Sequence, residues 1–159
     1  MKPQDIIKEL NLEPLKIEGG FFRETYRCKT TLPNGDSCGT CIYYMLASGQ
    51  RSDWHKVAKD EVWLYHAGSP AVQLLLFPDG HYEERLIGPP GSGGEPQSLI
   101  PAGVWQEEIL LDKSPDAWGL FGAVVIPAFE YSDFTADTGS ELAKQFPSAA
   151  KRITELGLL

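Results

Sequence analysis

The stretch Gly49–Gly68, with the sequence GQRSDWHKVAKDEVWLYHAG, decides the fold that we expect. It reads as two short strands, Trp54–Val57 and Glu61–His66, separated by the charged segment Ala58–Asp60. A short polar segment between two runs of strand-forming residues is typical of a tight reversal of the chain. The stretch therefore predicts a strand, a turn and a second strand.

The alternation of side chains along these strands places the reactive groups. Successive side chains of a strand point to opposite faces, so His55 shares a face with Val57, and Glu61 shares one with Trp63 and Tyr65. If the turn brings the two faces together, an imidazole and a carboxylate meet inside a barrel or sandwich. Trp63 and Tyr65 are then expected to line a cavity beside Glu61, because ligand sites are largely apolar with a few polar groups.

The rest of the chain repeats this pattern of short strands and turns. Gly- and Pro-rich turns at 33–36 and 78–80 each predict a hairpin. Helices are expected only at the ends, at Pro3–Leu12, Ser140–Gln145 and Ser148–Leu156, with Ser140 and Ser148 as caps. Many short strands with terminal helices predict an all-β barrel or sandwich.

The size and charge of the chain limit its partners. Its 159 residues form one domain, and 14 basic against 22 acidic residues give a formal net charge of −8. Scattered basic residues on an acidic chain repel phosphate backbones and anionic membranes, so neither is an expected partner. The most apolar run, Ala117–Phe129, is too short to span a bilayer, and the first residues lack a signal-peptide core. We therefore expect a cytoplasmic protein.

Two further motifs have ordinary interpretations. Cys38 and Cys41 match C-x-x-C, but they lie between a turn and a strand rather than at a helix start, so reduced thiols are expected. The loop Gly88–Gln97 is rich in glycine and proline, yet no helix follows it to cradle a phosphate. It is expected to be a connection or a mobile lid near the mouth of the barrel.

The spacing of four residues in the opening stretch resembles the first motif of the cupin superfamily. Gly49, His55, Glu61 and Gly68 stand at the motif's intervals, while Val57 replaces its second histidine. The segment Pro101–Gln106 resembles the second cupin motif, with Gln106 in place of the histidine of that motif. Further segments are similar to those of a branch of small, mostly uncharacterised cupins: Ile17–Arg27, Ser52–Val57, Asp60–Trp63 and Phe129–Phe134.

The resemblance implies a fold and an assembly. It implies a cupin-type double-stranded β-helix, the jelly-roll barrel, with a core at about residues 17–134 and short helices at both ends. Members of this branch commonly join two barrels, so the resemblance implies a homodimer. Exposed Phe21 or Phe22 is expected to serve that contact.

The resemblance also bears on a metal site. A typical cupin offers three histidines and a glutamate, whereas the matching positions here leave His55, Glu61 and Gln106. Transition metals favour imidazole over an amide oxygen, so we expect no cofactor or one weakly held divalent ion on these three residues. His66 does not replace a missing ligand, because alternation places it on the opposite face from Glu61.

Three functions are compatible with this reading. The first is a metal-independent isomerase or epimerase of a sugar or sugar nucleotide, in which His55 moves a proton, since imidazole titrates near neutral pH. Glu61 would orient His55, Gln106 would hold a substrate oxygen, and Tyr65 or Tyr43 would supply the acid. The second is a metal-dependent oxygenase or isomerase.

The third function is a module that binds a small polar metabolite without converting it. Under any of the three, Arg23 is expected to hold an anionic group of the ligand if its side chain faces the pocket.

Overall fold

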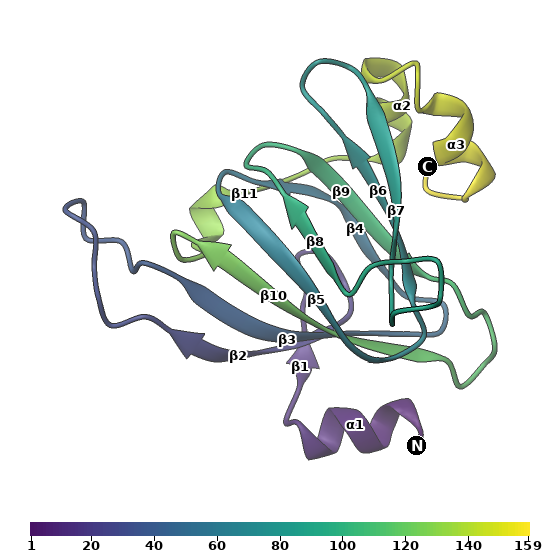
Figure 1. The fold of residues 1–159 in the computed structure, drawn as a ribbon. Coiled ribbons are helices and arrows are strands. Elements are labelled where there is room, and N and C mark those ends of the chain that lie inside the picture. Colours follow the sequence, from purple (N-terminus) through teal and green to yellow (C-terminus); the bar gives the residue numbers. More distant parts are fainter.

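The computed structural model describes residues 1–159 as two antiparallel sheets that face each other, with helices at the two ends of the chain (Figure 1). The elements are α1 (Pro3–Glu9), β1 (Glu13–Pro14), β2 (Phe21–Arg27), β3 (Thr40–Ala47), β4 (Arg51–Val57), β5 (Asp60–Gly68), β6 (Ala71–Leu76), β7 (Tyr82–Ile87), β8 (Gln97–Ile100), β9 (Trp105–Leu110), β10 (Trp118–Ile126), the 3-10 turn η1 (Tyr131–Asp133), β11 (Phe134–Ala136), α2 (Gly139–Gln145) and α3 (Ala150–Glu155). The predicted all-β architecture with terminal helices is confirmed.

The strand order separates the two halves of the opening stretch. The six-stranded sheet has the order β1-β2-β3-β10-β5-β8, and the five-stranded sheet has the order β11-β4-β9-β6-β7. Strands β4 and β5 therefore belong to different sheets and do not pair with each other. The turn between them carries the chain across the barrel, so that His55 and Glu61 approach each other from facing sheets.

Strand β9 shows how the interior and the outer layer are filled. Its residues are buried on both faces. Gln106 and Glu108 point between the sheets with Leu110, which belongs to the main core cluster. Trp105 points the other way, into a second cluster formed with the C-terminal helices. Such burial requires both faces of the sheet to be covered.

The C-terminal helices cover the outer face of the five-stranded sheet (Figure 1). Leu142, Phe146 and Ile153 pack against strands β4, β6 and β9. Trp54, whose side chain also points outward, donates from Nε1 to Leu158 O at 2.9 Å. These contacts bury the outer face of the five-stranded sheet.

The predicted caps of these helices were wrong. The N-cap of α2 is Thr138, whose hydroxyl accepts from Glu141 N at 3.3 Å. Ser148 instead donates to Gly80 O at 2.7 Å, which ties the segment before α3 to the β6–β7 turn. A serine before a helix can bond elsewhere whenever the fold brings another acceptor within reach.

The two predicted hairpins are present, joining β2 to β3 and β6 to β7. Phe21 and Phe22 are half-buried rather than exposed, because Phe22 packs against the main core and Phe21 against the cluster that includes α1. The three cysteines are free thiols. None of the helices has the length and apolar character needed to cross a membrane.

We predict that Ile153→Ala lowers the free energy of unfolding by about 2–5 kcal/mol, the usual cost of truncating a fully buried aliphatic side chain. Ile153 is 0 % exposed in the cluster between α3 and the sheet. Lys151→Ala, in the same helix but with a side chain 88 % exposed, is the control and should change stability by less than about 0.5 kcal/mol. Urea unfolding measures both, and equal effects would contradict the docking of α3.

Candidate functional site

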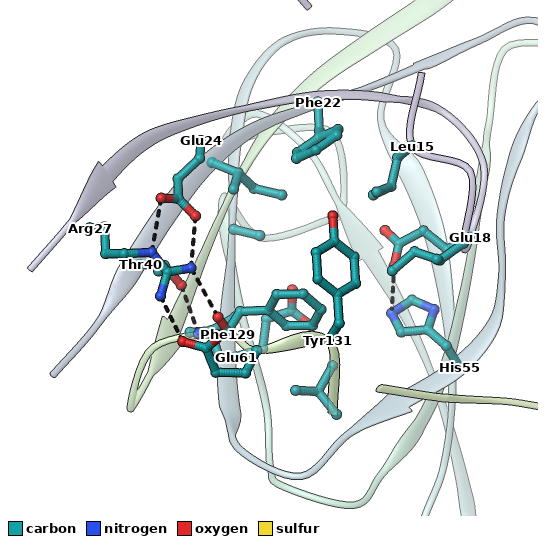
Figure 2. Close-up of a pocket in the computed structure, with 16 residues that line it drawn as sticks. Leu15, Glu18, Phe22, Glu24, Arg27, Thr40, His55, Glu61, Phe129 and Tyr131 are labelled. Carbon is teal, nitrogen blue, oxygen red and sulfur yellow. Dashed lines mark hydrogen bonds and ion pairs between the residues drawn. The ribbon is translucent and has the colours of Figure 1, made fainter. Parts of the chain in front are cut away.

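A cavity of about 130 Å³ opens between the two sheets (Figure 2). Sixteen residues line it, nine of them hydrophobic. The polar or ionisable side chains among them are Glu18, Glu24, Arg27, Thr40, His55, Glu61, Glu130 and Tyr131. The cavity therefore combines an apolar wall with a small set of titratable groups, as ligand sites usually do.

Four of these groups come from four different chain segments. His55 comes from β4 and Glu61 from β5, the two strands joined by the turn in the opening stretch. Glu18 comes from the segment between β1 and β2, and Tyr131 from the segment that follows β10. The sequence predicted the first pair, and the fold adds the other two.

One hydrogen bond and one close polar contact orient His55, which is 2 % exposed. Its Nδ1 lies 2.8 Å from Asp53 O. Because a carbonyl oxygen only accepts, Nδ1 carries the proton and donates, which leaves Nε2 as the basic nitrogen of the neutral ring. Nε2 lies 3.3 Å from Glu18 Oε2 (Figure 2). The ring also stacks on Phe134, with centroids 5.1 Å apart.

Burial keeps both members of this contact uncharged near neutral pH. Desolvation raises the pKa of Glu18 to about 8, against a smaller opposing effect of Ser52. Desolvation likewise lowers the pKa of His55, against the opposing charge of Glu61. The favoured arrangement at pH 7 is a carboxylic acid beside a neutral imidazole, rather than an ion pair.

Glu61 is held by the residue at the second motif position. Gln106, which is fully buried, donates from Nε2 to Glu61 Oε2 at 2.6 Å. Desolvation raises the pKa of Glu61, and the proximity of His55 opposes this. Glu61 Oε1 receives no hydrogen bond within the protein, and Gln106 Oε1 is buried without a partner.

A second chain of buried polar groups lies beside Glu61 inside the barrel. Gln73 donates to Glu108 at 2.8 Å and accepts from Ser98 at 2.6 Å. Desolvation raises the pKa of Glu108 well above its usual value, with Glu61 and Glu18 adding to the shift. The interior thus holds three buried carboxyl groups and no buried cation among their hydrogen-bond partners.

Arg27 organises the mouth of the cavity. Its guanidinium contacts Glu24 Oε2 at 3.0 Å and Glu130 Oε1 at 2.9 Å, and it donates to Phe129 O at 3.1 Å (Figure 2). Lys59 supports the same segment by donating to Ala128 O at 2.7 Å. These contacts hold Phe129 and Tyr131 against the opening.

The residues expected to bind a metal do not converge as a ligand set. Gln106 presents its amide nitrogen to Glu61, and a nitrogen that donates a hydrogen bond is no metal ligand. The basic nitrogen of His55 faces Glu18 instead. The structure contains no group of three or more His, Cys, Asp or Glu side chains placed to hold a metal ion. We derive no chemical step through a metal here.

Four residues expected to contact a ligand lie elsewhere. The guanidinium of Arg23 lies 5.5 Å from the ring centroid of Tyr43, on the outward face of β2 and β3, where Tyr43 also contacts exposed His66. Trp63 is buried in the main core, and the Tyr65 hydroxyl donates to Gly68 O at 2.8 Å. Alternation explains the first pair, because the neighbouring Phe22, Glu24 and Ile42 occupy the inward face.

The Gly88–Gln97 loop, expected to be a connection or a mobile lid, does not border this cavity. No residue of the Gly88–Gln97 loop lines it. The loop is bonded to the sheets instead, since Glu95 N donates to Leu86 O at 2.9 Å and Tyr65 N to Pro96 O at 2.8 Å.

Sequence reasoning missed Glu18, although its surroundings carried a signal. Gly19 and Gly20 follow it with φ values of 95° and 72°. A Cβ atom would lie 2.6 Å from Arg51 O at Gly19 and 2.7 Å from the Tyr44 hydroxyl at Gly20. Only glycine combines this backbone with such close packing, so the pair holds Glu18 against the barrel rather than merely ending a segment.

Comparisons with known proteins agree with this architecture. The sequence profile of a family described as Cupin superfamily (DUF985) matches residues 4–136. A crystal structure of a Shewanella oneidensis protein superposes with a TM-score of 0.84 at 30% identity, covering 92% of this chain and 91% of that one. A hypothetical protein from Leishmania major gives 0.83 at 26% identity, covering 92% and 93%.

A more distant likeness supports the fold alone. Oxalate decarboxylase from Bacillus subtilis superposes with a TM-score of 0.57 at 16% identity, covering 91% of this chain but only 37% of that one. No curated protein sequence matches this chain.

We predict that the Glu18→Gln substitution flattens the pH dependence of stability between pH 6.5 and 8. Folded Glu18 keeps its proton up to about pH 8, whereas an unfolded glutamate loses it near 4.5, so stability falls as pH rises through this window. One such group contributes a slope of up to about 1.4 kcal/mol per pH unit. Urea unfolding at several pH values measures it.

The control for this experiment is Glu9→Gln, which changes an exposed glutamate of α1. His55 does not confuse the comparison, because its lowered pKa affects stability only below about pH 6.5. If Glu18→Gln retains the full slope of the unmodified protein, Glu18 is ionised in the folded state and the assignment fails.

Proposed function

The chain belongs to the cupin superfamily, and from this premise we propose that it is an isomerase that acts on a small carbonyl compound by proton transfer in the barrel. The observation that carries the proposal is the contact of Nε2 of a neutral His55 with the carboxyl group of Glu18, 3.3 Å away. Burial raises the pKa of Glu18 to about 8 and lowers that of His55, so a protonated acid stands beside a neutral base, an arrangement typical of acid–base catalysis.

The size of the cavity limits the substrate. About 10–15 Å³ of such space accommodates one water-sized group, so 130 Å³ corresponds to roughly ten non-hydrogen atoms. A monosaccharide or a smaller hydroxy-carbonyl compound is of this size. A sugar nucleotide is several times larger, and its nucleotide would have to lie outside the barrel.

The proposed reaction begins with removal of a proton. His55 Nε2 takes a proton from the carbon next to the substrate carbonyl group, while the carboxylic acid of Glu18 protonates the carbonyl oxygen. The electrons of the broken C–H bond form the double bond of an enol, and His55 and Glu18 become an imidazolium and a carboxylate. Glu61 stabilises the imidazolium by its charge.

Reversal at the neighbouring carbon completes the reaction. His55 returns its proton to the former carbonyl carbon, and Glu18 takes a proton from the hydroxyl group of the adjacent carbon, which becomes the new carbonyl group. A single base on one side of the substrate favours this carbonyl transposition over epimerisation, which needs an acid on the opposite side. The step uses only Glu18 and His55 and restores both to their starting states.

A binding module without chemistry is the second candidate. Nine of the sixteen lining residues are hydrophobic, and Arg27 is already bonded to two glutamates. Such a cavity is suited to hold a small molecule regardless of whether a proton moves.

We predict that the protein exchanges the hydrogen next to the carbonyl group of a substrate with solvent deuterium, and that His55→Ala lowers this rate at least about 100-fold. Proton NMR in D₂O detects the exchange across a panel of small aldoses, ketoses and hydroxy acids without knowledge of the product. The control is His81→Ala, which removes a histidine whose side chain is 50 % exposed and lies outside the cavity.

The two candidates give different results in this assay. Exchange that depends on His55 supports the isomerase. A compound that raises the melting temperature of the protein without any exchange supports the binding module, and exchange that survives His55→Ala removes His55 from its proposed role.

A further inference from the structure

The ionisable groups around the cavity are strongly unbalanced in sign. Four glutamates line it, from four different chain segments, against one arginine and one histidine. They are Glu18, Glu24, Glu61 and Glu130. An anionic ligand would therefore approach mainly carboxyl groups.

The single arginine already forms ion pairs within the protein. Arg27 binds Glu24 through two of its nitrogens, at 3.0 Å each, and binds Glu130 at 2.9 Å. An anion that recruited this guanidinium would have to displace two ion pairs. The guanidinium of Arg27 is therefore fully paired within the protein. The mouth carries no spare positive charge, because two carboxylates face this one guanidinium.

The two inner glutamates have no cation. Glu18 contacts the imidazole of His55, and Glu61 accepts only from the amide of Gln106. Glu61 is 8 % exposed, lines the cavity, and keeps Oε1 free of any hydrogen bond within the protein. Because Glu61 lines the cavity, a donor group of a ligand there can hydrogen-bond to this oxygen.

The rest of the wall suits a cation that is partly apolar. Aromatic rings of Phe22, Phe129 and Tyr131 line the cavity, and Tyr131, which is 65 % exposed, lies on its solvent-facing side (Figure 2). The rings of Phe129 and Tyr131 lie 5.5 Å apart in an edge-to-face arrangement. Aromatic faces attract ammonium groups, and the attraction is stronger where water is excluded.

We propose that the cavity selects a ligand with a protonated amine, held between Glu18 and Glu61 with its carbon skeleton against the aromatic wall. This inference rests on the proposed function and deepens it, since it narrows the substrate class to a small amino-substituted carbonyl compound. It excludes carboxylate and phosphate substrates. The ammonium group supplies the positive charge that the two inner carboxyl groups lack.

Binding of such a ligand is coupled to proton release. Burial raises the pKa of Glu61, and an ammonium group beside its Oε1 favours the carboxylate form, so binding releases a proton from protonated Glu61. Glu18 keeps the proton that the reaction needs, because burial raises its pKa to about 8, and its carbonyl oxygen accepts from the ammonium group. The other charged or titratable groups that face the cavity are His55, Glu24, Arg27, Glu130 and Tyr131. His55 is neutral. At the mouth, Glu24 and Glu130 both pair with Arg27, which leaves one net negative charge.

The test uses three probes of equal shape and different charge: butylammonium, butanol and butyrate. With EDTA present, isothermal titration calorimetry should show butylammonium binding at least about tenfold more tightly than butanol, and butyrate more weakly than both. Titration in two buffers of different ionisation enthalpy should show about one proton released per butylammonium bound. These probes test charge preference independently of the substrate's identity.

Variants assign the preference to the inner carboxyl groups. Glu61→Gln keeps the shape of the side chain and should abolish the preference for butylammonium over butanol, and Glu61→Leu provides the same test if the first variant does not fold. Glu9→Gln is the control and should keep the preference. Equal or tighter binding of butyrate, a preference that survives both substitutions, or no measurable binding of butylammonium would overturn the proposal.

The outcomes separate this inference from the proposed function. Charge selectivity without His55-dependent hydrogen exchange would leave an ammonium-binding site and remove the chemistry. Exchange on uncharged or anionic sugars, with no preference for butylammonium, would keep the isomerase and remove the ammonium site.

Discussion

The hydrogen bond from Gln106 Nε2 to Glu61 Oε2, 2.6 Å long, joins the two sheets across the interior of the barrel. Ser98 and Gln73 make a second such connection between the sheets, also at 2.6 Å. These bonds place a carboxyl group, a hydroxyl group and two amide groups where a purely apolar core would be easier to build. The fold therefore accepts buried polar groups, and each of them must be neutral, hydrogen-bonded or matched by a ligand.

This constraint connects stability with chemistry. Removing a carboxyl group from water favours its protonated form, and removing an imidazole from water favours its neutral form. In Glu18 and His55 the same desolvation therefore prepares an acid and a base side by side. A positively charged ligand would favour the ionised form of Glu61, which is why the charge of the substrate and the protonation of the site are linked. Residues that are costly to bury are expected at functional sites.

Local sequence patterns predicted the parts of this structure that depend on local geometry. Turn residues located both hairpins, and alternation placed His55 and Glu61 inside and Trp54 outside. Arg23 and Tyr43 were misplaced because each lies in a strand whose two faces carry both polar and aromatic residues, so the pattern does not show which face is inward. Glu18 is 37 residues from His55 in the chain, and only the path of the segment between β1 and β2 brings it to the imidazole.

The central claim is that Glu18 and His55 form a neutral acid–base pair inside the barrel. The most direct measurement is an NMR titration of the side-chain carboxyl carbon of Glu18 and the ring carbons of His55 in the folded protein, with assignments from Glu18→Gln and His55→Ala. The account predicts a midpoint near pH 8 for Glu18 and an imidazole that stays neutral, protonated on Nδ1, at pH 6.5. An ordinary glutamate midpoint near 4.5 for Glu18 together with a protonated His55 at pH 7 would show an ion pair and contradict it.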